Sequence, residues 1–513
     1  MTDSSPIVRF DHISVRFPGA LANDDVTLSI RRGEAFALVG ENGAGKTTLM
    51  NVLYGLVRPT LGEVRIKEAL VSQRHDPMRA IAMGVGMVHQ HFKLVPGFTV
   101  AQNIALGTEP TKNLLFYDQK RLNRDVLALA KRFGLPVNPA DIVGDLSVGL
   151  QQRVEILKAL HRGADILILD EPTAVLSPAE ADELFEVLRG MILGQGKTVI
   201  LITHKLHEVM QFSDRVGVMK QGKLVGVVNT ADTDEKQLAA MMVGREVLFD
   251  DLRSGEPGEQ EVLTLQNLQA MDDRGLPAVK GISLTLHAGE IVGVCGVEGN
   301  GQTELTECIM GLRPQAGGEV ILNGQNISRL SPGEIRAMGV SFIPADRIRT
   351  GLSAEATVTE NMLVGKQRQP AFQRFGIQFR KRHATAYARE LAEAFDVRSG
   401  GVDLPMKSLS GGNMQKAIIA REFSFNTPVL IINQPTRGVD IGAIEFIHEK
   451  ILEKRAAGCA ILLVSSDLDE LFRLSDRLVT LYEGQLTGSF QNGAISRQEI
   501  SYYMTGDRQE GQA

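Results

Sequence analysis

Short apolar runs alternate along this chain with longer segments in which charged and apolar residues recur at helical spacing. Residues 35–39 have the pattern of a strand, and the apolar runs 166–169 and 198–203 are typical of strands buried on both faces. Segments 48–56 and 120–133 show helical periodicity instead. Strands that alternate with helices in this way predict an α/β fold built on a parallel sheet.

Part of this pattern occurs twice. Residues 33–45 have a counterpart at 289–301, and Ser213-Asp214-Arg215 reappears as Ser475-Asp476-Arg477. The offset between the copies is 256 at the first match (302 minus 46) and 262 at the second (475 minus 213). Self-similarity over such a distance predicts two copies of one domain in tandem.

The two copies set the expected domain boundaries. We expect the first domain to span residues 7–245 and the second to span residues 261–507. The intervening segment 246–260 contains Asp250-Asp251 and the run Gly255-Glu256-Pro257-Gly258, a composition typical of a short polar linker.

Composition narrows the class of protein. The chain has 513 residues, of which 23% are charged and 43% apolar, as in a soluble globular protein of more than one core. A net charge of −6 gives no reason to expect nucleic acid as a partner. Cys295, Cys308 and Cys459 lack metal-ligand spacing and are interpreted as buried thiols of a reduced cytoplasmic protein. No apolar run reaches the ~18 residues of a membrane span, and the start of the chain lacks the apolar core of a signal peptide.

The first copy contains a phosphate-binding loop between the predicted strand 35–39 and the predicted helix 48–56. It matches G-x-x-x-x-G-K-[ST] without exception. Glycines allow successive backbone N–H groups to point at phosphate oxygens, Lys46 supplies a positive charge, and the Thr47 hydroxyl can bind Mg²⁺. We therefore predict a nucleoside-triphosphate site formed by Gly40, Glu41, Asn42, Gly43, Ala44, Gly45, Lys46, Thr47 and Thr48.

Further polar residues stand at the ends of predicted strands. Gln90 follows the strand-like run 84–89, Asp170-Glu171 follow 166–169, and His204 follows 198–203. Functional groups at the carboxyl ends of parallel strands are what this architecture predicts. A separate segment, Leu146-Ser147-Val148-Gly149-Leu150-Gln151-Gln152, opens another predicted helix, and we call it the first signature segment.

Taken in order, these motifs resemble the ATPase subunits of ABC transporters, and the resemblance covers nearly the whole chain twice. It implies two tandem P-loop NTPase domains, each with a parallel-sheet core, an antiparallel β subdomain and a helical subdomain. It also implies ATP and Mg²⁺ as ligands. Asp170 would hold Mg²⁺ through water, Glu171 would polarise the attacking water, and His204 would bond the γ-phosphate. Gln90 would complete the Mg²⁺ and water shell and sense a membrane partner.

Several of these residues have an alternative interpretation. Glu171 could cap the turn before Pro172, and His204 could be an ordinary core histidine. His89 and His91 flank Gln90 in the manner of a pair of metal ligands, but a third ligand is lacking nearby. Phe17 could stack on adenine or belong to the core.

The second copy departs from the family pattern at its chemical positions. Gln302 replaces the loop lysine, Ala345 stands at the place of Gln90, Asn433-Gln434 replace Asp-Glu, and Ser466 replaces the histidine. A neutral amide loses a charge-assisted bond to phosphate worth about 1.5–3 kcal/mol. The second signature segment, Leu409-Ser410-Gly411-Gly412-Asn413-Met414-Gln415, is intact, whereas the first has Val148 in place of a glycine.

The resemblance implies a reason for this distribution, because two such domains stack head to tail and share each ATP. One composite site would combine Lys46, Gln90, Asp170, Glu171 and His204 with Ser410, Gly411 and Gly412. The other would combine Gln302, Asn433, Gln434 and Ser466 with Ser147 and Val148. All losses then fall in one site, and we expect one hydrolytic site per chain, with the second binding nucleotide weakly or regulating.

Twin domains with a short linker resemble importers for ribose- and galactose-type sugars and for nucleosides. The local sequences favour the nucleoside group in four segments, residues 86–92, 146–149, 174–178 and 434–440. This implies two membrane permeases and an extracytoplasmic substrate-binding protein as partners, and a peripheral position on the cytoplasmic face of the membrane.

A soluble twin ATPase acting on ribosomes or DNA is the alternative class, and the short acidic linker does not favour it. Ser177, where the first half usually carries Asp, contrasts with Asp440 in the second.

Overall fold

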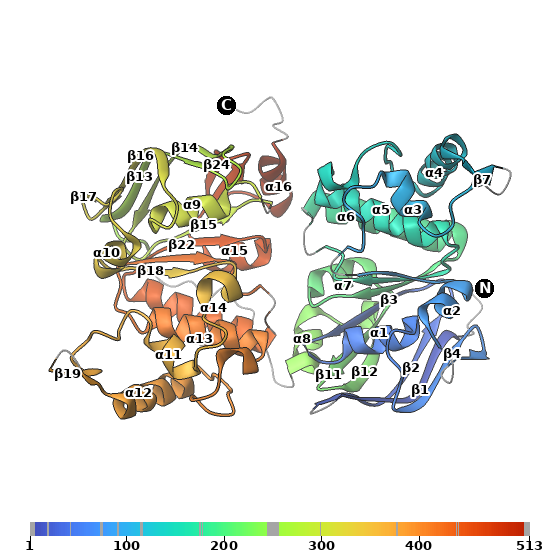
Figure 1. Cartoon of the computed structure of the whole chain (residues 1–513), viewed down its shortest axis with the longest axis horizontal. Coiled ribbons are helices and arrows are strands. Elements are labelled where there is room, and N and C mark those ends of the chain that lie inside the picture. The colour runs from blue at the N-terminus through green and yellow to red at the C-terminus, as the bar shows by residue number, and fades with distance from the viewer. Residues whose placement is uncertain are drawn as a thin grey trace. The chain divides into compact units, whose positions relative to one another are not determined.

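The structure is a computed structural model that describes residues 6–17, 20–41, 43–71, 75–89, 92–112, 116–173, 176, 178–243, 256–297, 299–375, 378–437, 439 and 441–506. It divides into two compact units, Met1–Phe249 and Asp250–Ala513 (Figure 1). Residues 244–255, which hold most of the predicted linker, lie outside the described part. Each unit is considered by itself below.

The first unit is centred on a six-stranded sheet in the order β12-β11-β3-β10-β9-β6. Its strands are β3 (Ala35–Gly40), β6 (Val85–Val88), β9 (Ile166–Asp170), β10 (Thr198–Ile202), β11 (Arg215–Lys220) and β12 (Lys223–Asn229). All neighbours are parallel except β11 and β12, which pair antiparallel at the edge. Every residue of β3, β9 and β10 is buried, as expected for apolar strands covered on both faces.

A second, antiparallel sheet in the first unit has the order β2-β1-β4-β5. It is formed by β1 (Pro6–Phe17), β2 (Ala20–Arg31), β4 (Leu61–Ile66) and β5 (Ala69–Leu70). Buried and exposed residues alternate along much of β2. The buried residues of these strands share one apolar cluster with residues of α1 and of the parallel sheet. That cluster fixes the position of the phosphate loop, which lies between β3 and α1.

The helices of the first unit include a helical subdomain, α3 to α5. The helices are α1 (Lys46–Tyr54), α2 (Pro77–Ala82), α3 (Val100–Ala105), α4 (Gln119–Phe133), α5 (Val148–His161), α6 (Pro178–Gln195), α7 (Leu206–Phe212) and α8 (Glu235–Val243). A short hairpin, β7 (Thr111–Lys112) and β8 (Phe116–Tyr117), lies between α3 and α4. The predicted helix 120–133 is confirmed as α4, and the predicted helix 48–56 begins two residues earlier, at Lys46.

The second unit repeats this architecture. Its parallel-sheet order, β24-β23-β15-β22-β21-β18, and its antiparallel order, β14-β13-β16-β17, match the first unit strand for strand. The strands are β13 (Glu261–Met271), β14 (Pro277–His287), β15 (Ile291–Cys295), β16 (Gln315–Leu322), β17 (Gln325–Asn326), β18 (Val340–Ile343), β19 (Gln373–Arg374), β20 (Gln378–Phe379), β21 (Val429–Asn433), β22 (Ala460–Ser465), β23 (Arg477–Tyr482) and β24 (Gln485–Gln491). The helices are α9 (Gln302–Ile309), α10 (Pro332–Ala337), α11 (Val358–Leu363), α12 (Lys381–Ala394), α13 (Gly411–Phe423), α14 (Ile441–Ala456), α15 (Leu468–Leu474) and α16 (Arg497–Thr505).

The repeated Ser-Asp-Arg motif holds the central strand of each unit. The Asp214 carboxylate accepts a hydrogen bond from the backbone N–H of Ala35 at 2.8 Å, and Asp476 accepts one from Ile291 at 2.8 Å. The arginine that follows each aspartate bonds a buried glutamate, Arg215 with Glu34 and Arg477 with Glu290. The repeat that the sequence reveals here is therefore structural rather than catalytic.

Two further predictions have a counterpart in the fold. Cys295, Cys308 and Cys459 are free and buried, as predicted. The α/β fold class is confirmed, with the parallel core, the antiparallel β subdomain and the helical subdomain present in both units. Among the described residues, none of the helices is both long enough and apolar enough to span a bilayer.

Candidate nucleotide site

The phosphate loop of the first unit turns sharply at Gly45, just before α1. Gly45 has φ of +95°, and a Cβ at this position would lie 2.3 Å from the carbonyl oxygen of Ala22. The Asn23 side chain, fully buried, donates to the Gly45 carbonyl at 3.1 Å. Only glycine therefore fits the conformation that turns the loop into the N-terminus of α1.

The Lys46 side chain is buried against the loop that precedes it. Its Nζ donates to the carbonyl oxygens of Gly40 at 2.6 Å and Glu41 at 3.0 Å. Burial lowers the pKa of Lys46, although the carboxylates of Glu171, Asp170 and Glu41 act in the opposite direction. The ammonium group thus lies at the mouth of the loop, where a phosphate oxygen is a better partner than a neutral carbonyl.

Thr47 and Asp170 bring two oxygen donors together next to Lys46. The Thr47 hydroxyl donates to the Asp170 carboxylate at 3.1 Å, which joins the start of α1 to the end of β9. Burial is the main cause that raises the pKa of Asp170 to about 6, and Glu171 adds to it. Hydrogen bonding by Thr47 and the charge of Lys46 work against that rise. Nearby positive charge and hydrogen bonds do not offset the burial of this carboxylate, so binding of a cation beside it is favoured.

Glu171 and His204 form the third part of the site. His204 Nδ1 lies 2.8 Å from Glu171 Oε1, and Glu171 is held at φ +48° in the left-handed region. A glutamate rarely adopts this conformation, so the turn after β9 is strained in order to direct the carboxylate. Burial acts to raise the pKa of Glu171, but His204, Lys46 and Lys205 together outweigh it and leave the pKa lowered. The carboxylate is consequently ionised near neutral pH.

The remaining predicted residues of this unit fall into two groups. Gly40, Glu41, Gly43, Ala44 and Thr48 lie in the loop or the first turn of α1, as predicted, and Phe17 ends β1 with 43% of its surface exposed. Asn42, Gln90, His91 and Ser177 lie outside the described residues. His89 packs edge-on against the Tyr54 ring at 6.1 Å, and the described part of the chain holds no cluster of three metal-ligating side chains.

In the second unit, Gln302 occupies its own phosphate loop. Its amide oxygen accepts the backbone N–H of Asn300 at 3.0 Å, and its Nε2 donates to the Val297 carbonyl at 2.8 Å. A lysine can only donate, whereas this amide also consumes an N–H group that would otherwise bind phosphate. The loop keeps its shape, since Gly301 has φ of +104°, but it satisfies its own hydrogen bonds.

The other substituted positions of the second unit are also internally paired. Asn433 Nδ2 lies 3.4 Å from Thr306 Oγ1, one helical turn beyond the residue that matches Thr47. The Ser466 hydroxyl donates to Gln434 at 3.2 Å, and Gln434 keeps a left-handed φ of +55°. Ala345 follows β18 and is half-buried. This unit retains the backbone of the first site without its charged groups.

Both signature segments begin a helix in which the serine is the N-cap. Ser147 Oγ accepts from the N–H of Leu150 at 3.4 Å, and Ser410 Oγ accepts from Asn413 at 3.4 Å. Val148, which replaces the glycine, is solvent-exposed.

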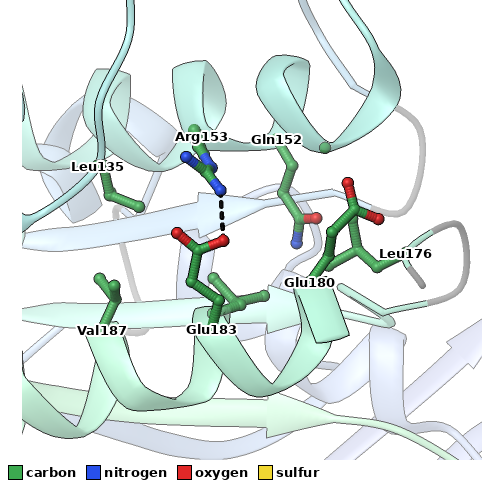
Figure 2. A pocket seen from close by; sticks show the side chains of 9 residues that line it. Leu135, Gln152, Arg153, Leu176, Glu180, Glu183 and Val187 are labelled. Atoms are coloured by element: carbon green, nitrogen blue, oxygen red, sulfur yellow. Dashed lines mark hydrogen bonds and ion pairs between the residues drawn. The ribbon is translucent and has the colours of Figure 1, made fainter. Parts of the chain in front are cut away.

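A small pocket lies between α5, which the first signature segment opens, and α6. The Arg153–Glu183 ion pair at 2.6 Å crosses this pocket (Figure 2). Gln152, 2% exposed, lines this pocket with both side-chain polar atoms unbonded among the described residues.

One residue near the second signature segment was not predicted. Arg347, in the π-helical turn Arg347–Gly351, donates to the carbonyl of Arg437 at 3.0 Å. A Cβ at Gly411 would lie 2.8 Å from its Nη2. Burial lowers the pKa of Arg347, and the charge of Arg437 lowers it further. Arg347 thus lies beside Gly411 at the start of α13 and close to Arg437. The sequence signals this arginine only by its place two residues beyond Ala345.

The repeated sheet order and the phosphate loops define a protein with two tandem P-loop nucleotide-binding domains. The model of the family described as "ABC transporter" matches residues 23–174 and 279–437. The chain belongs to the ABC transporter family.

Relatives of this family match the chain over almost its full length. The nucleoside import ATP-binding protein NupA of Lactococcus lactis subsp. cremoris and the guanosine import ATP-binding protein NupO of Bacillus subtilis are each 45% identical, with 98% of both chains covered. The glucose import ATP-binding protein TsgD13 of Haloferax volcanii is 44% identical, over 98% of this chain and 96% of its own. A putative ribose/galactose/methyl galactoside import ATP-binding protein of Burkholderia cenocepacia is 37% identical, over 98% and 97%.

Proposed function

We propose that this chain hydrolyses ATP to power the import of a small polar solute, with a nucleoside as the favoured class. The observation that carries the proposal is the convergence of Lys46, Thr47, Asp170, Glu171 and His204 at one end of the parallel sheet. A charged donor, an oxygen pair and an ionised base together provide what phosphoryl transfer to water requires.

Each residue has a role that follows from its chemistry. Lys46 binds the terminal phosphates as a point charge, and Glu171 polarises the attacking water because its carboxylate is ionised. His204 holds Glu171 through the 2.8 Å contact and bonds the γ-phosphate through its other ring nitrogen. Gln90 contributes to the water shell, and Phe17 offers an exposed ring for adenine.

The residues present fit Mg²⁺. The Thr47 hydroxyl and the Asp170 carboxylate are oxygen donors of the kind that Mg²⁺ prefers, and they lie 3.1 Å apart. Thr47, Asp170 and Gln90 would hold the ion, Asp170 through water. When bound, Mg²⁺ neutralises charge on the phosphates.

We further propose that the competent site is completed by Ser410, Gly411 and Gly412 of the second signature segment. The support is the distribution of losses along the sequence: the intact loop and the intact signature belong to different copies. The second site, built on Gln302, Asn433, Gln434 and Ser466, would bind nucleotide weakly or regulate. The hydrogen bond from the backbone N–H of Asn300 to the Gln302 side chain supports weak binding at the second site, because this N–H group is then not available to a phosphate.

The substrate class rests on relatives. Two relatives named for nucleoside or guanosine import share 45% identity with the chain, and ribose/galactose-type importer subunits share 37%. A simple sugar is the second candidate, and the glucose importer subunit at 44% identity favours it. We expect two integral-membrane permeases and, through them, an extracytoplasmic substrate-binding protein as partners, with the chain peripheral on the cytoplasmic face of the membrane and no nucleic acid bound.

The test is stimulation of ATPase activity in proteoliposomes that contain the chain, its permeases and the binding protein. Nucleosides should raise phosphate release above the basal rate, whereas monosaccharides should not. Stimulation by glucose or ribose alone would establish the second candidate. Copurification with ribosomes or DNA in place of permeases would reject transport altogether.

A further inference from the structure

The helical subdomain of the second unit contains a long segment without acidic residues. Residues 361–389 include seven basic side chains and neither aspartate nor glutamate, in a chain whose net charge is −6. The matching segment of the first unit, residues 103–127, has four basic and three acidic side chains. The positive charge is therefore local and specific to the second unit.

The middle of this segment connects α11 to α12 and contains a short hairpin, and its last residues belong to α12. Strands β19 and β20 form the hairpin, and Figure 1 shows β19 at the outer end of the helical subdomain. Phe372 anchors it, because this ring is buried and packs against Tyr387 at 5.2 Å. Lys366 is also buried and donates to Tyr387 Oη at 2.7 Å and to the Ser424 carbonyl at 2.8 Å. Phe372 and Lys366 stabilise the base of the hairpin and are not available to a partner.

Four other basic side chains of this segment face solvent. Arg368, Arg374, Lys381 and Arg382 are exposed, and within the described residues none of them has a carboxylate within 4 Å. The charge of Lys381 contributes to the lowered pKa of Glu360, but Glu360 is engaged in the capping box of α11. Exposed cations that are not paired with a carboxylate create a positive potential to which anions are attracted.

Two aromatic side chains of the hairpin are also exposed. Phe375 is 87% exposed and Phe379 is 50% exposed. Phe375 has φ of +57°, an uncommon conformation for a bulky residue, and the guanidinium of Arg374 lies 5.3 Å from its ring centre. Phe375 therefore combines an exposed apolar ring with a strained backbone, and this combination suggests that the ring contacts an external partner.

We propose that this cationic–aromatic hairpin region binds the anionic phospholipid surface of the membrane. It comprises Arg368 before the hairpin, Arg374, Phe375 and Phe379 within it, and Lys381 and Arg382 at the start of α12. Lysine and arginine attract anionic headgroups, and aromatic rings favour the boundary between headgroup and acyl chain. The unpaired cations complement a surface of negative charge, and the two exposed rings suit the apolar layer just beneath the headgroups. At a lipid surface each cation and each ring contributes separately to binding.

The experiment measures sedimentation of the purified full-length chain with large vesicles. Binding to vesicles of phosphatidylcholine plus phosphatidylglycerol should exceed binding to phosphatidylcholine alone and should weaken as salt is raised. The triple variant Arg374→Glu, Lys381→Glu and Arg382→Glu should lower the partition coefficient at least about tenfold. Phe375→Ser with Phe379→Ser should lower it several-fold and leave the salt dependence in place.

The matched control reverses three charges on the equivalent helix of the first unit, Lys120→Glu, Arg121→Glu and Arg124→Glu in α4. This control should bind vesicles as the unmodified chain does, and both triple variants should retain basal ATPase activity, which reports correct folding. Equal binding to zwitterionic vesicles, or equal loss in the two triple variants, would overturn the proposal. Unchanged vesicle binding with lost permease copurification would instead assign the hairpin to an acidic protein surface.

Discussion

His204 Nδ1 lies 2.8 Å from Glu171 Oε1, and in the second unit the Ser466 hydroxyl takes the same place at 3.2 Å from Gln434. The backbone hydrogen bonds are the same in both units. The backbone N–H of Glu171 donates to the Ile202 carbonyl at 2.9 Å, and that of Gln434 donates to the Val464 carbonyl at 2.8 Å. Both residues also keep φ near +50°. The second unit has therefore lost an ionisable pair without losing the strained turn that presents it.

Glu171→Gln should stop turnover and spare nucleotide binding. The amide fills the same space and can still contact His204, but it cannot accept a proton or polarise water as a carboxylate does. We expect phosphate release to fall by about 10²–10⁴-fold, the usual contribution of a general base. Steady-state phosphate release and fluorescent-ATP titration measure the two effects separately.

The reverse change, Gln434→Glu, is the matched control. It restores the carboxylate at the equivalent strained turn, yet Gln302 and Asn433 still lack the charges needed for phosphate and metal. Turnover should change by less than about twofold, because one restored group does not rebuild a site whose members act as a unit. A large gain in this variant would argue that the second unit is limited by its base alone.

The two phosphate loops should respond unequally to loss of their defining side chain. Lys46→Ala removes a charge-assisted contact worth about 1.5–3 kcal/mol, so ATP affinity should fall roughly 10–150-fold and turnover with it. Gln302→Ala removes only an internal pair with Asn300 and Val297 and should leave turnover within about twofold. Titration of ATPase rate against ATP for both variants gives the comparison. Equal losses would contradict the proposal of a single hydrolytic site.

Asp170 should make the nucleotide-free protein less stable as pH rises. Its folded pKa of about 6 exceeds the ordinary 3.8, so between these values the folded state binds more protons than the unfolded state. Stability from this group falls from about pH 4 to pH 6, and the full cost above pH 6 is about 3 kcal/mol. Asp170→Asn should therefore melt at higher temperature than the unmodified chain at pH 7.5, and the difference should shrink toward pH 4.5. A pH-independent difference would contradict the raised pKa.

Sequence alone was sufficient for the parts of the site that depend on residue type and order. The apolar runs around residues 166–169 and 198–203 are confirmed as strands that deliver Asp170 and His204 to one edge of the sheet. The reason is that a buried parallel strand leaves a clear apolar signature, and its polar successor must emerge at the carboxyl end. The family assignment, which the ordered series of motifs made possible, is confirmed by the family model and the relatives.

Contacts between distant side chains could not be predicted in this way. That Gln302 would satisfy the N–H of Asn300 depends on the curvature of the loop, and a glutamine side chain has several rotamers. The approach of Arg347 to Gly411 depends on a π-helical turn that has no composition signal of its own. The hairpin between α11 and α12 was likewise missed, although its lack of acidic residues is visible in the sequence.

Arg347 should act as a positioning residue for the second signature segment. Its guanidinium braces the Arg437 carbonyl and covers Gly411, so Arg347→Ala should loosen the start of α13. If Ser410, Gly411 and Gly412 complete the competent site, kcat should fall several-fold with little change in the KM for ATP. Arg349→Ala, an exposed arginine in the same turn, is the control and should leave kcat unchanged. A loss confined to KM would place Arg347 in ground-state binding instead.

The two Ser-Asp-Arg repeats should contribute unequally to stability, although each aspartate accepts a hydrogen bond from the equivalent backbone N–H of the central strand. Asp476 also bonds Arg455 at 2.7 Å, and the Arg455 side chain is 4% exposed, whereas Asp214 bonds an Arg189 that is 33% exposed at 2.9 Å. Breaking a buried pair costs about 3–5 kcal/mol, while an exposed pair is worth about 1 kcal/mol or less. Asp476→Asn should therefore lower the unfolding temperature of the full chain more than Asp214→Asn, as measured by calorimetry at neutral pH. Equal shifts would mean that the shared backbone hydrogen bond, rather than the arginine, accounts for the stabilisation.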